Sequence, residues 1–566
     1  MGYNDIKQLD FSTAINWLCH DARDDFFPDP LRYVDIKRFS KEFLKRTEHT
    51  LLIHKLHQPE CYEIPKANYL IRNAISLKLQ ARIIYLALLQ KLAPYINPII
   101  PSTTYSYRIP NNCKVDQGEY PFSTEQSMSQ WHEYINDFRR LSILDDCKYI
   151  VITDLANFFD HIRIDNFVGQ LRMIICQNGS DTALESYLMK LKELLESFST
   201  TGYGIPQNYD PSSFFCSAYL SSLDLTMQRE GYRFFRYVDD IRMVASSKAE
   251  VRKSLHRLQK VIRDFGLYLS SAKTKIYEKG SPEFEKIVDV TDDRILSDYE
   301  ETLKKQDALQ IESTIPDLFE KLKYHDKTSC DDRKFRAYAN KLLKTAEFNE
   351  FGNKILPKLK EYAFERLRTH PERSDSWSRF ISPDVDEECQ KELLYILTHD
   401  DYREISWQRM WIFETLLRAD ELKIGGCIDE ARKVSDKDPC SFVRGRAILF
   451  RGKFGDDIER ERIACDFFKM NESIDIKRAV VISVKDMQED RRNDHYERFL
   501  KIDNNVEELI NYIKENDKVK YSTYSFIKRK ISQKPKEIRI IAKRGIGLIN
   551  KEPVIFRLPS TDAEYM

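Results

Sequence analysis

Residues 233–244 read Arg-Phe-Phe-Arg-Tyr-Val-Asp-Asp-Ile-Arg-Met-Val, and this stretch decides the fold of the chain. Apolar residues flank two adjacent carboxylates, Asp239 and Asp240, so the pattern predicts a strand, a tight acidic turn and a return strand. Two neighbouring carboxylates repel each other and cannot pack in an apolar core, and a divalent cation is the usual compensating charge. A lone Asp-Asp pair is more often a solvated turn, so its interpretation depends on two segments upstream.

The first segment, residues 149–160, reads Tyr-Ile-Val-Ile-Thr-Asp-Leu-Ala-Asn-Phe-Phe-Asp. Its apolar run ends at Asp154, as in a buried strand that delivers a carboxylate to a sheet edge. The second segment, Thr-Gly-Tyr-Gly-Ile-Pro-Gln at 201–207, predicts a loop that leads into a helix over 212–225. In this order the three segments indicate a palm-type polymerase. Its carboxylates, from separate strands, hold two metal ions about 3.5–4 Å apart.

These motifs resemble those of reverse transcriptases over roughly residues 60–280. In chain order they are similar to the fingers motifs (62–66 and 70–72), the first catalytic motif (154–160), the template and nucleotide loop (204–207), the metal hairpin (237–240) and the lysine-bearing segment after it (270–275). One departure is Asn208, where the family has Gly; Asn is the next residue most tolerant of positive φ, so we expect the loop to form.

Within this superfamily the chain most resembles the bacterial abortive-infection (AbiK/AbiA-type) defence reverse transcriptases. The resemblance rests on Pro65-Lys66, Arg72, residues 105–108 and 157–159, and the long helical C-terminal half. It implies an α+β fold, with right-hand fingers and palm followed by an all-α domain. It also implies DNA synthesis in antiphage defence, which in better-known members starts from a protein hydroxyl and can proceed without a template.

The resemblance implies a catalytic role for the acids of two motifs. The catalytic residues would be Asp154, Asp239 and Asp240, which would also bind two Mg²⁺ (or Mn²⁺) ions. The main-chain carbonyl of Leu155 would complete the coordination shell of one of these ions. The alternative for each carboxylate is a structural role in a turn. Arg242, just past the acidic pair, is interpreted either as a basic neighbour of a primer strand or as an edge-strand charge.

The resemblance also implies a nucleotide site. Phe159 would stack under the sugar and exclude a 2′-hydroxyl, so that the enzyme selects dNTPs, and Gln207 would hydrogen-bond near the incoming nucleotide. The alternatives are a core aromatic residue and an ordinary polar loop residue.

Four basic residues are candidates for contact with the triphosphate. Lys66 and Arg72 would clamp it, because guanidinium and ammonium groups suit phosphate oxygens. Lys275, or Lys273, would lie near the leaving pyrophosphate as acid or counter-charge, and the sequence does not choose between them. A solvated surface charge is the alternative for Lys66 and Arg72.

The composition limits how the chain can bind nucleic acid and where it can reside, and shifts in composition indicate its domain boundaries. The 566 residues include 90 basic and 90 acidic residues, so nucleic acid must bind to a local patch. Eleven cysteines without a C-x-x-C pair argue against a zinc ribbon, and no long apolar run occurs, so we expect a soluble cytoplasmic protein without a membrane segment. We expect an N-terminal helical extension (1–60), fingers and palm (61–285), a helical domain in place of a thumb (286–515) and a basic segment (516–566).

The helical half shows weak internal similarity. Similar segments begin at Ser406, Ser441 and Ser473, a spacing that suits stacked helix pairs of a HEAT-like α-solenoid. Such an array makes a homo-oligomer plausible. Chance amphipathicity is the alternative.

The C-terminal segment has a basic and aromatic character. Residues 518–544 hold ten basic residues against one acid, interleaved with aromatic residues. This is the chemistry of backbone contact plus base stacking, so Lys528, Arg529 and Lys530 are candidates for nucleic-acid binding. A solvated basic face is the alternative.

Three functions compete. The first is a defence DNA polymerase that uses dNTPs and makes single-stranded DNA, which could be attached to a protein hydroxyl; RNA template use stays open. The second is a mobile-element RNA-directed DNA polymerase of intron or retron type, against which stands the lack of a C-x-x-C or HNH-type endonuclease module. The third is a non-catalytic scaffold that keeps the palm, against which stand the three intact aspartates.

Overall fold

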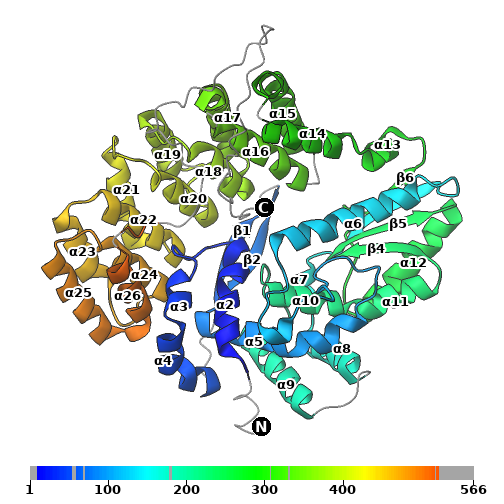
Figure 1. The fold of residues 1–566 in the computed structure, drawn as a ribbon, viewed down its shortest axis with the longest axis horizontal. Helices are drawn as coiled ribbons and strands as arrows, with labels where there is room; N and C mark the ends of the chain where they lie inside the picture. The colour runs from blue at the N-terminus through cyan, green and yellow to red at the C-terminus, as the bar shows by residue number, and fades with distance from the viewer. Residues whose placement is uncertain are drawn as a thin grey trace, which may run out of the picture.

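The computed structural model describes residues 9–53, 59–67, 70–176, 182–199, 201–305, 307–328, 332–347, 349–516 and 518–521. The predicted nucleic-acid contacts of Lys528, Arg529 and Lys530 lie outside these residues. The fold is α+β, as predicted: small sheets and helices form the first half and helices alone the second (Figure 1). No helix among the described residues is both long and apolar enough to span a bilayer.

The centre of the first half is a four-stranded antiparallel sheet. Its strand order is β4-β5-β3-β6, with bounds β3 Tyr149–Asp154, β4 Arg233–Tyr237, β5 Asp240–Ala245 and β6 Lys275–Glu278. Side chains alternate between the two faces of a strand. The register pairs Asp154 with Asp240, so the predicted buried strand and the predicted hairpin end at the same edge of the sheet.

Helices cover both faces of this sheet. On one face lies α6 (Thr124–Ser142), whose Tyr134 and Phe138 pack with Phe235 and Val244. The other face joins a larger apolar core built by α5 Leu79–Ile96, α8 Ile164–Cys176, α9 Thr182–Ser197, α10 Asp210–Tyr219, α11 Ser221–Arg229 and α12 Lys248–Asp264. The helix expected over 212–225 is thus two helices, which meet at Leu220.

A two-stranded hairpin and three N-terminal helices stand beside the sheet. The hairpin pairs β1 Glu60–Pro65 with β2 Ile71–Ser76 in antiparallel register, and the helices are α2 Phe11–Asp21, α3 Val34–Arg38 and α4 Ser40–Ile53. The short helix α7 (Phe158–His161) follows β3 directly. This places the fingers motifs and the first catalytic motif on neighbouring elements.

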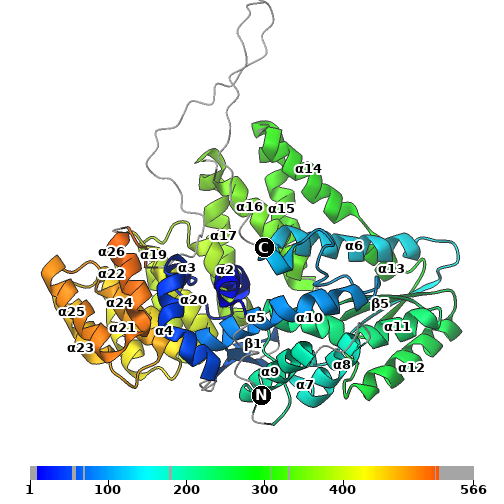
Figure 2. The ribbon, with the colours of Figure 1, turned by 60° about the horizontal axis from the view of Figure 1, so that its bottom comes forward.

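The second half is an array of helices that starts beside the sheet and curves back to α3 (Figure 1). Its helices are α13 Pro282–Val288, α14 Thr291–Lys305, α15 Ala308–Thr328, α16 Asp332–Ala346, α17 Asn349–Thr369, α18 Ser374–Ile381, α19 Glu387–Thr398, α20 Ser406–Leu416, α21 Gly426–Lys437, α22 Ser441–Phe454, α23 Asp457–Phe467, α24 Ile474–Ser483, α25 Glu489–Ile502 and α26 Glu507–Glu515. Figure 2 shows α26, at the end of the array, near α3.

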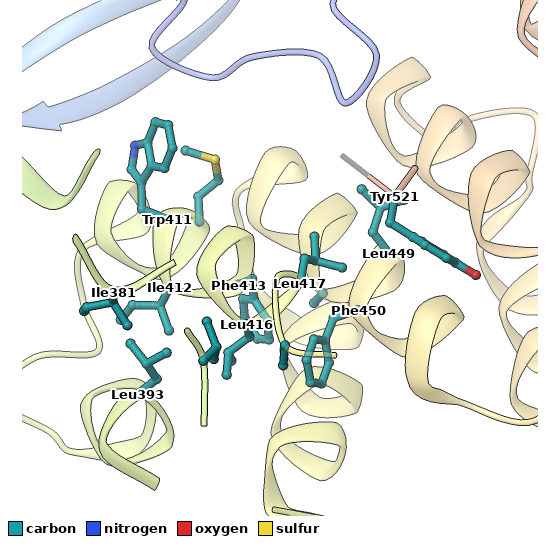
Figure 3. Close-up of a cluster of buried hydrophobic side chains, with 14 of the residues drawn as sticks. Ile381, Leu393, Trp411, Ile412, Phe413, Leu416, Leu417, Leu449, Phe450 and Tyr521 are labelled. Atoms are coloured by element: carbon teal, nitrogen blue, oxygen red, sulfur yellow. The ribbon is translucent and has the colours of Figure 1, made fainter. Parts of the chain in front are cut away.

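The three similar segments of the sequence are α20, α22 and α24, which pack side by side in this order. Between α20 and α22 the core is aromatic and aliphatic: Figure 3 shows Phe413 and Leu416 near Phe450, and the Phe413 and Phe450 rings are 6.1 Å apart. Every residue of α20 from Met410 to Leu416 is buried. Among them Glu414 pairs with Arg446 of α22 at 2.8 Å, as a buried charge requires.

The array and the N-terminal part share one core. Phe27 stacks on Phe442 of α22 at 4.9 Å, and Tyr62 of β1 packs against the same ring. The guanidinium of Arg478 (α24) donates two hydrogen bonds each to Asp29 and Asp35, and all three side chains are buried. A buried charge is tolerated only with such partners, so these contacts fix the far end of the array against the first half.

Candidate active site

Three carboxylates from separate segments meet at the sheet edge. Asp154 ends β3 and lies opposite Asp240, the first residue of β5, while Asp239 occupies the turn between β4 and β5. The turn is tight, and Val238 adopts a left-handed φ of 54°. The N–H of Leu155 donates to the carbonyl of Asp239 at 3.2 Å, so the two acidic motifs are joined through the backbone.

The environment of Asp239 disfavours its charged form. Burial, followed by the negative charges of Asp154 and Asp240, raises the pKa of Asp239 to about 6. Lys273 opposes this shift only in part. Carboxylates held this close resist simultaneous ionisation, which is the electrostatic condition for binding a divalent cation.

Lys273 is the lysine that reaches the carboxylates. Its Nζ donates to Oδ2 of Asp154 at 2.9 Å. Burial lowers the pKa of Lys273, but the hydrogen bond and charge of Asp154 outweigh this effect, so that the pKa is raised. Lys275 begins β6 opposite Ile152 and its side chain is exposed. The structure therefore separates two lysines that the sequence could not distinguish, with Lys273 at the acidic edge.

A buried arginine, which the sequence analysis missed, supports the turn. The Arg236 guanidinium is fully buried and donates to the carbonyl of Val238 at 2.9 Å and to Asp224 of α11 at 2.8 Å. The N–H of Val238 donates to Ser106 Oγ at 2.8 Å. The strand reads Arg-Phe-Phe-Arg-Tyr, and this pattern does not mark Arg236 as buried, because its partner Asp224 lies on another element.

Arg242 does not have the edge-strand environment, which is one of its two expected environments. It lies on β5, an interior strand of the sheet, and the edge-strand interpretation is therefore wrong. Its guanidinium carbon lies 5.0 Å from the Phe138 ring centre and 5.3 Å from that of Tyr134. Because α6 covers this part of the sheet, Arg242 contributes cation–π contacts to the packing of α6.

The glycine loop packs on the first catalytic motif. The N–H of Ile205 donates to the carbonyl of Phe159 at 3.1 Å, and that of Gly204 to the carbonyl of Ile162 at 2.9 Å. Gly204 has a φ of 90°, which favours glycine. Phe158 is buried in the core, whereas Phe159 is half-buried beside it, 5.2 Å ring to ring. Phe159 is thus the more accessible of the pair.

The residue after Gln207 adopts the conformation that the family's glycine would supply. Asn208 has a φ of 62°, and its Nδ2 donates to the carbonyl of Asp24 at 3.0 Å. The loop therefore forms with Asn, as expected. Gln207 is half-buried and lines a pocket together with Phe26 and Tyr62 of the N-terminal part.

Basic groups of the hairpin β1–β2 face the first catalytic motif. Lys66 Nζ donates to Asn157 Oδ1 at 3.3 Å. Burial and then the positive charge of Arg72 lower the pKa of Lys66, while Asp160 partly compensates. Lys66 and Arg72 are therefore close enough to repel each other, an arrangement that a phosphate anion relieves.

The chemistry of the donor set fits Mg²⁺ or Mn²⁺. Both ions prefer carboxylate and carbonyl oxygen, which Asp154, Asp239, Asp240 and the main chain of Leu155 offer. Among the described residues no three His, Cys, Asp or Glu side chains are already gathered around a metal position. Asp154 is instead bound to Lys273, so it would exchange this partner for a cation.

Comparison with known proteins agrees with this geometry. Residues 64–306 match the family described as reverse transcriptase (RNA-dependent DNA polymerase). No curated protein matches the chain in sequence.

Similar solved structures are telomerases of Candida species. Apo telomerase from Candida tropicalis has a TM-score of 0.31 and 10% identity, covering 84% of this chain and 73% of that one. Telomerase from Candida albicans with a TWJ fragment of telomeric RNA has a TM-score of 0.30 and 10% identity, covering 85% and 70%. Candida tropicalis telomerase truncated from its C-terminal domain has a TM-score of 0.29 and 12% identity, covering 43% of this chain and 55% of that one. This chain thus spans little more than half the length of that structure. The family match of residues 64–306 is thus to reverse transcriptases, which are RNA-dependent DNA polymerases.

Proposed function

We propose that this protein polymerises dNTPs into DNA by two-metal catalysis at the sheet edge. The observation that carries the proposal is that Asp154, Asp239 and Asp240, from two strands and one turn, lie at one edge of the sheet. A scaffold has no need for a buried carboxyl group beside two others, where burial and then the charge of Asp154 raise the pKa of Asp239 to about 6. The cluster is costly for folding and useful for catalysis.

The residues of the chain divide the work of the reaction. Asp154, Asp239, Asp240 and the carbonyl of Leu155 would hold two Mg²⁺ or Mn²⁺ ions. When bound, such ions activate a 3′-hydroxyl and stabilise the charge of the leaving pyrophosphate. Lys273, with its raised pKa, stays protonated near neutral pH and can offer a proton or positive charge to the pyrophosphate.

The remaining site residues orient the nucleotide. Lys66 and Arg72 would bind the triphosphate from the hairpin β1–β2, and Phe159 would stack under the sugar and exclude a 2′-hydroxyl. Gln207 would hydrogen-bond near the base. Of the two lysines that the sequence leaves open for the pyrophosphate, we favour Lys273 over Lys275, because Nζ of Lys273 lies 2.9 Å from Oδ2 of Asp154.

The test is direct incorporation. Purified protein is incubated with labelled dNTPs and Mg²⁺, with and without RNA, and label is followed on nucleic acid and on the protein itself. The proposal predicts label incorporation by the wild type and none by Asp154→Asn. Label on the protein would indicate a protein hydroxyl as primer, and no incorporation under any template condition would contradict the proposal.

We further propose a role in cytoplasmic antiphage defence by abortive infection, supported by the resemblance of the motifs. The product would be single-stranded DNA, guided by the HEAT-like array, by a homo-oligomer of the chain and by the basic residues Lys528, Arg529 and Lys530. Cells that carry the gene should lower phage plating, and the Asp239→Asn/Asp240→Asn variant should not. Equal plating on both strains would refute this role while leaving polymerisation intact.

A further inference from the structure

Helix α6 links the metal hairpin to the helical array. One side of α6 packs on the sheet, where Tyr134 and Phe138 contact Phe235. Towards its C-terminal end, Arg139 donates to Asp293 at the start of α14 and to the carbonyl of Asp289. The helix is therefore anchored both to the strands that carry the catalytic acids and to the first helices of the array.

The second link is a stack of three side chains. The guanidinium carbon of Arg333, from α16 of the array, lies 3.3 Å from the Trp131 ring centre and 4.9 Å from that of Tyr237. Trp131 and Tyr237 meet edge to face at 5.1 Å. The Tyr237 hydroxyl donates to the carbonyl of Ser127 at 3.3 Å. Arg333 thus contacts one aromatic residue of α6 and one of the hairpin.

Tyr237 is the residue through which this stack can act on the site. It ends β4, it pairs with Asp240, and only Val238 separates it from Asp239. Its side chain is buried between α6 and Arg333. Because Asp154, Asp239 and Asp240 repel one another, the hairpin keeps its geometry only if its flanking residues are held from outside.

We propose that Arg333 is a positioning residue for the metal hairpin, so that the helical array helps to set the geometry of the catalytic acids. The proposal rests on the function proposed above. Removal of the guanidinium uncovers the Trp131 and Tyr237 rings and releases Tyr237, which loosens the turn that carries Asp239. A looser turn holds two repelling carboxylates less well, and its affinity for a divalent cation falls.

The chain provides a matched control on the same helix. Arg336 lies one turn further along α16, and its guanidinium pairs with Asp375 of α18 at 3.9 Å, within the array. Arg336→Ala removes the same charge from α16 without touching the stack. Arg333→Lys keeps a cation over the rings, since ammonium groups also make cation–π contacts.

The experiment measures metal binding and catalysis separately on the full-length protein. Mn²⁺ binding to metal-free wild type, Arg333→Ala, Arg333→Lys and Arg336→Ala is followed by calorimetry, and dNTP incorporation is followed against Mg²⁺ concentration. A cation–π contact of this kind predicts a loss of Mn²⁺ affinity of about threefold to tenfold in Arg333→Ala. We expect Arg333→Lys to recover part of it and Arg336→Ala to match the wild type.

The outcomes distinguish this inference from the proposed function. Equal Mn²⁺ affinity and Mg²⁺ dependence in Arg333→Ala and Arg336→Ala would overturn the positioning role. So would an effect confined to the KM for nucleic acid, because Arg333 would then be a contact for the strand. If Asp239→Asn/Asp240→Asn polymerises as well as the wild type, the proposed function itself fails, whatever Arg333 does. Thermal unfolding of each variant shows whether a loss reflects misfolding.

Discussion

Replacing Asp239 by Asn should stabilise the protein when no metal is present. The native state raises the pKa of Asp239 from 3.8 to about 6 because of burial and then the charge of Asp154. The folded protein therefore binds a proton more tightly than the unfolded chain, and folding with an ionised Asp239 is penalised. Asn has a similar shape and no charge, so this penalty disappears.

The magnitude follows from the linkage between pKa and stability. Each pKa unit corresponds to about 1.4 kcal/mol, so a rise from 3.8 to about 6 costs up to about 3 kcal/mol once Asp239 is ionised in both states. Below about pH 3 the carboxyl is protonated in both states and no cost remains. The gain from Asp239→Asn should thus be near zero there, grow as the pH rises from 3.8 to about 6, and level off above that range.

The assay is urea unfolding of wild type and variant in a chelator, at pH 4, 5 and 7.5. Asp145→Asn, which removes an exposed carboxylate from the loop after α6, is the control and should change little at any pH. Excess Mg²⁺ should narrow or reverse the difference at pH 7.5, because the ion binds the wild type more tightly and stabilises it by mass action. A variant that is less stable than the wild type at pH 7.5 in chelator would refute the reasoning.

Three further predictions concern sugar selection, the pyrophosphate side of the site and the contact between the end of the helical array and the N-terminal part. Phe159→Ala should admit rNTPs, measured as a lower dNTP/rNTP ratio; an unchanged ratio in an active variant would make Phe159 a core residue. Lys273→Ala should lower dNTP incorporation far more than Lys275→Ala. A larger loss in Lys275→Ala would instead assign the pyrophosphate contact to Lys275. Arg478→Ala leaves Asp29 buried without its partner and should cost about 3–5 kcal/mol of unfolding free energy, measured by denaturant; a loss below 1 kcal/mol would show that the interface relaxes.

The parts of the fold that could be predicted from sequence are those specified locally. The hairpin at 237–240 follows from alternation around an acidic turn. The carboxylate at the end of β3 follows from the apolar run before it. The positive φ of Asn208 follows from its place in a glycine loop. Each pattern spans a few residues. The register that brings Asp154 opposite Asp240 is set by the pairing of β3 with β5, which the sequence analysis did not predict.

Other features depend on partners far away in the chain and carry no local pattern. Arg236 donates a hydrogen bond to Asp224 on another element, and Arg478 donates to carboxylates more than 440 residues upstream. The choice between Lys273 and Lys275 depends on how β6 meets β3. The contact of Arg333 with Trp131 depends on where the array begins. Sequence spacing cannot specify such contacts, because they are set by the packing of whole elements.

The central claim is that carboxylates from β3 and the hairpin form one two-metal centre. It is tested most directly by labelled dNTP incorporation in Mg²⁺ by Asp239→Asn/Asp240→Asn, with thermal unfolding as the measure of folding. We predict a fall in incorporation by orders of magnitude in a protein that unfolds at or above the wild-type temperature in chelator. Incorporation at the wild-type rate by the folded double variant would contradict the claim.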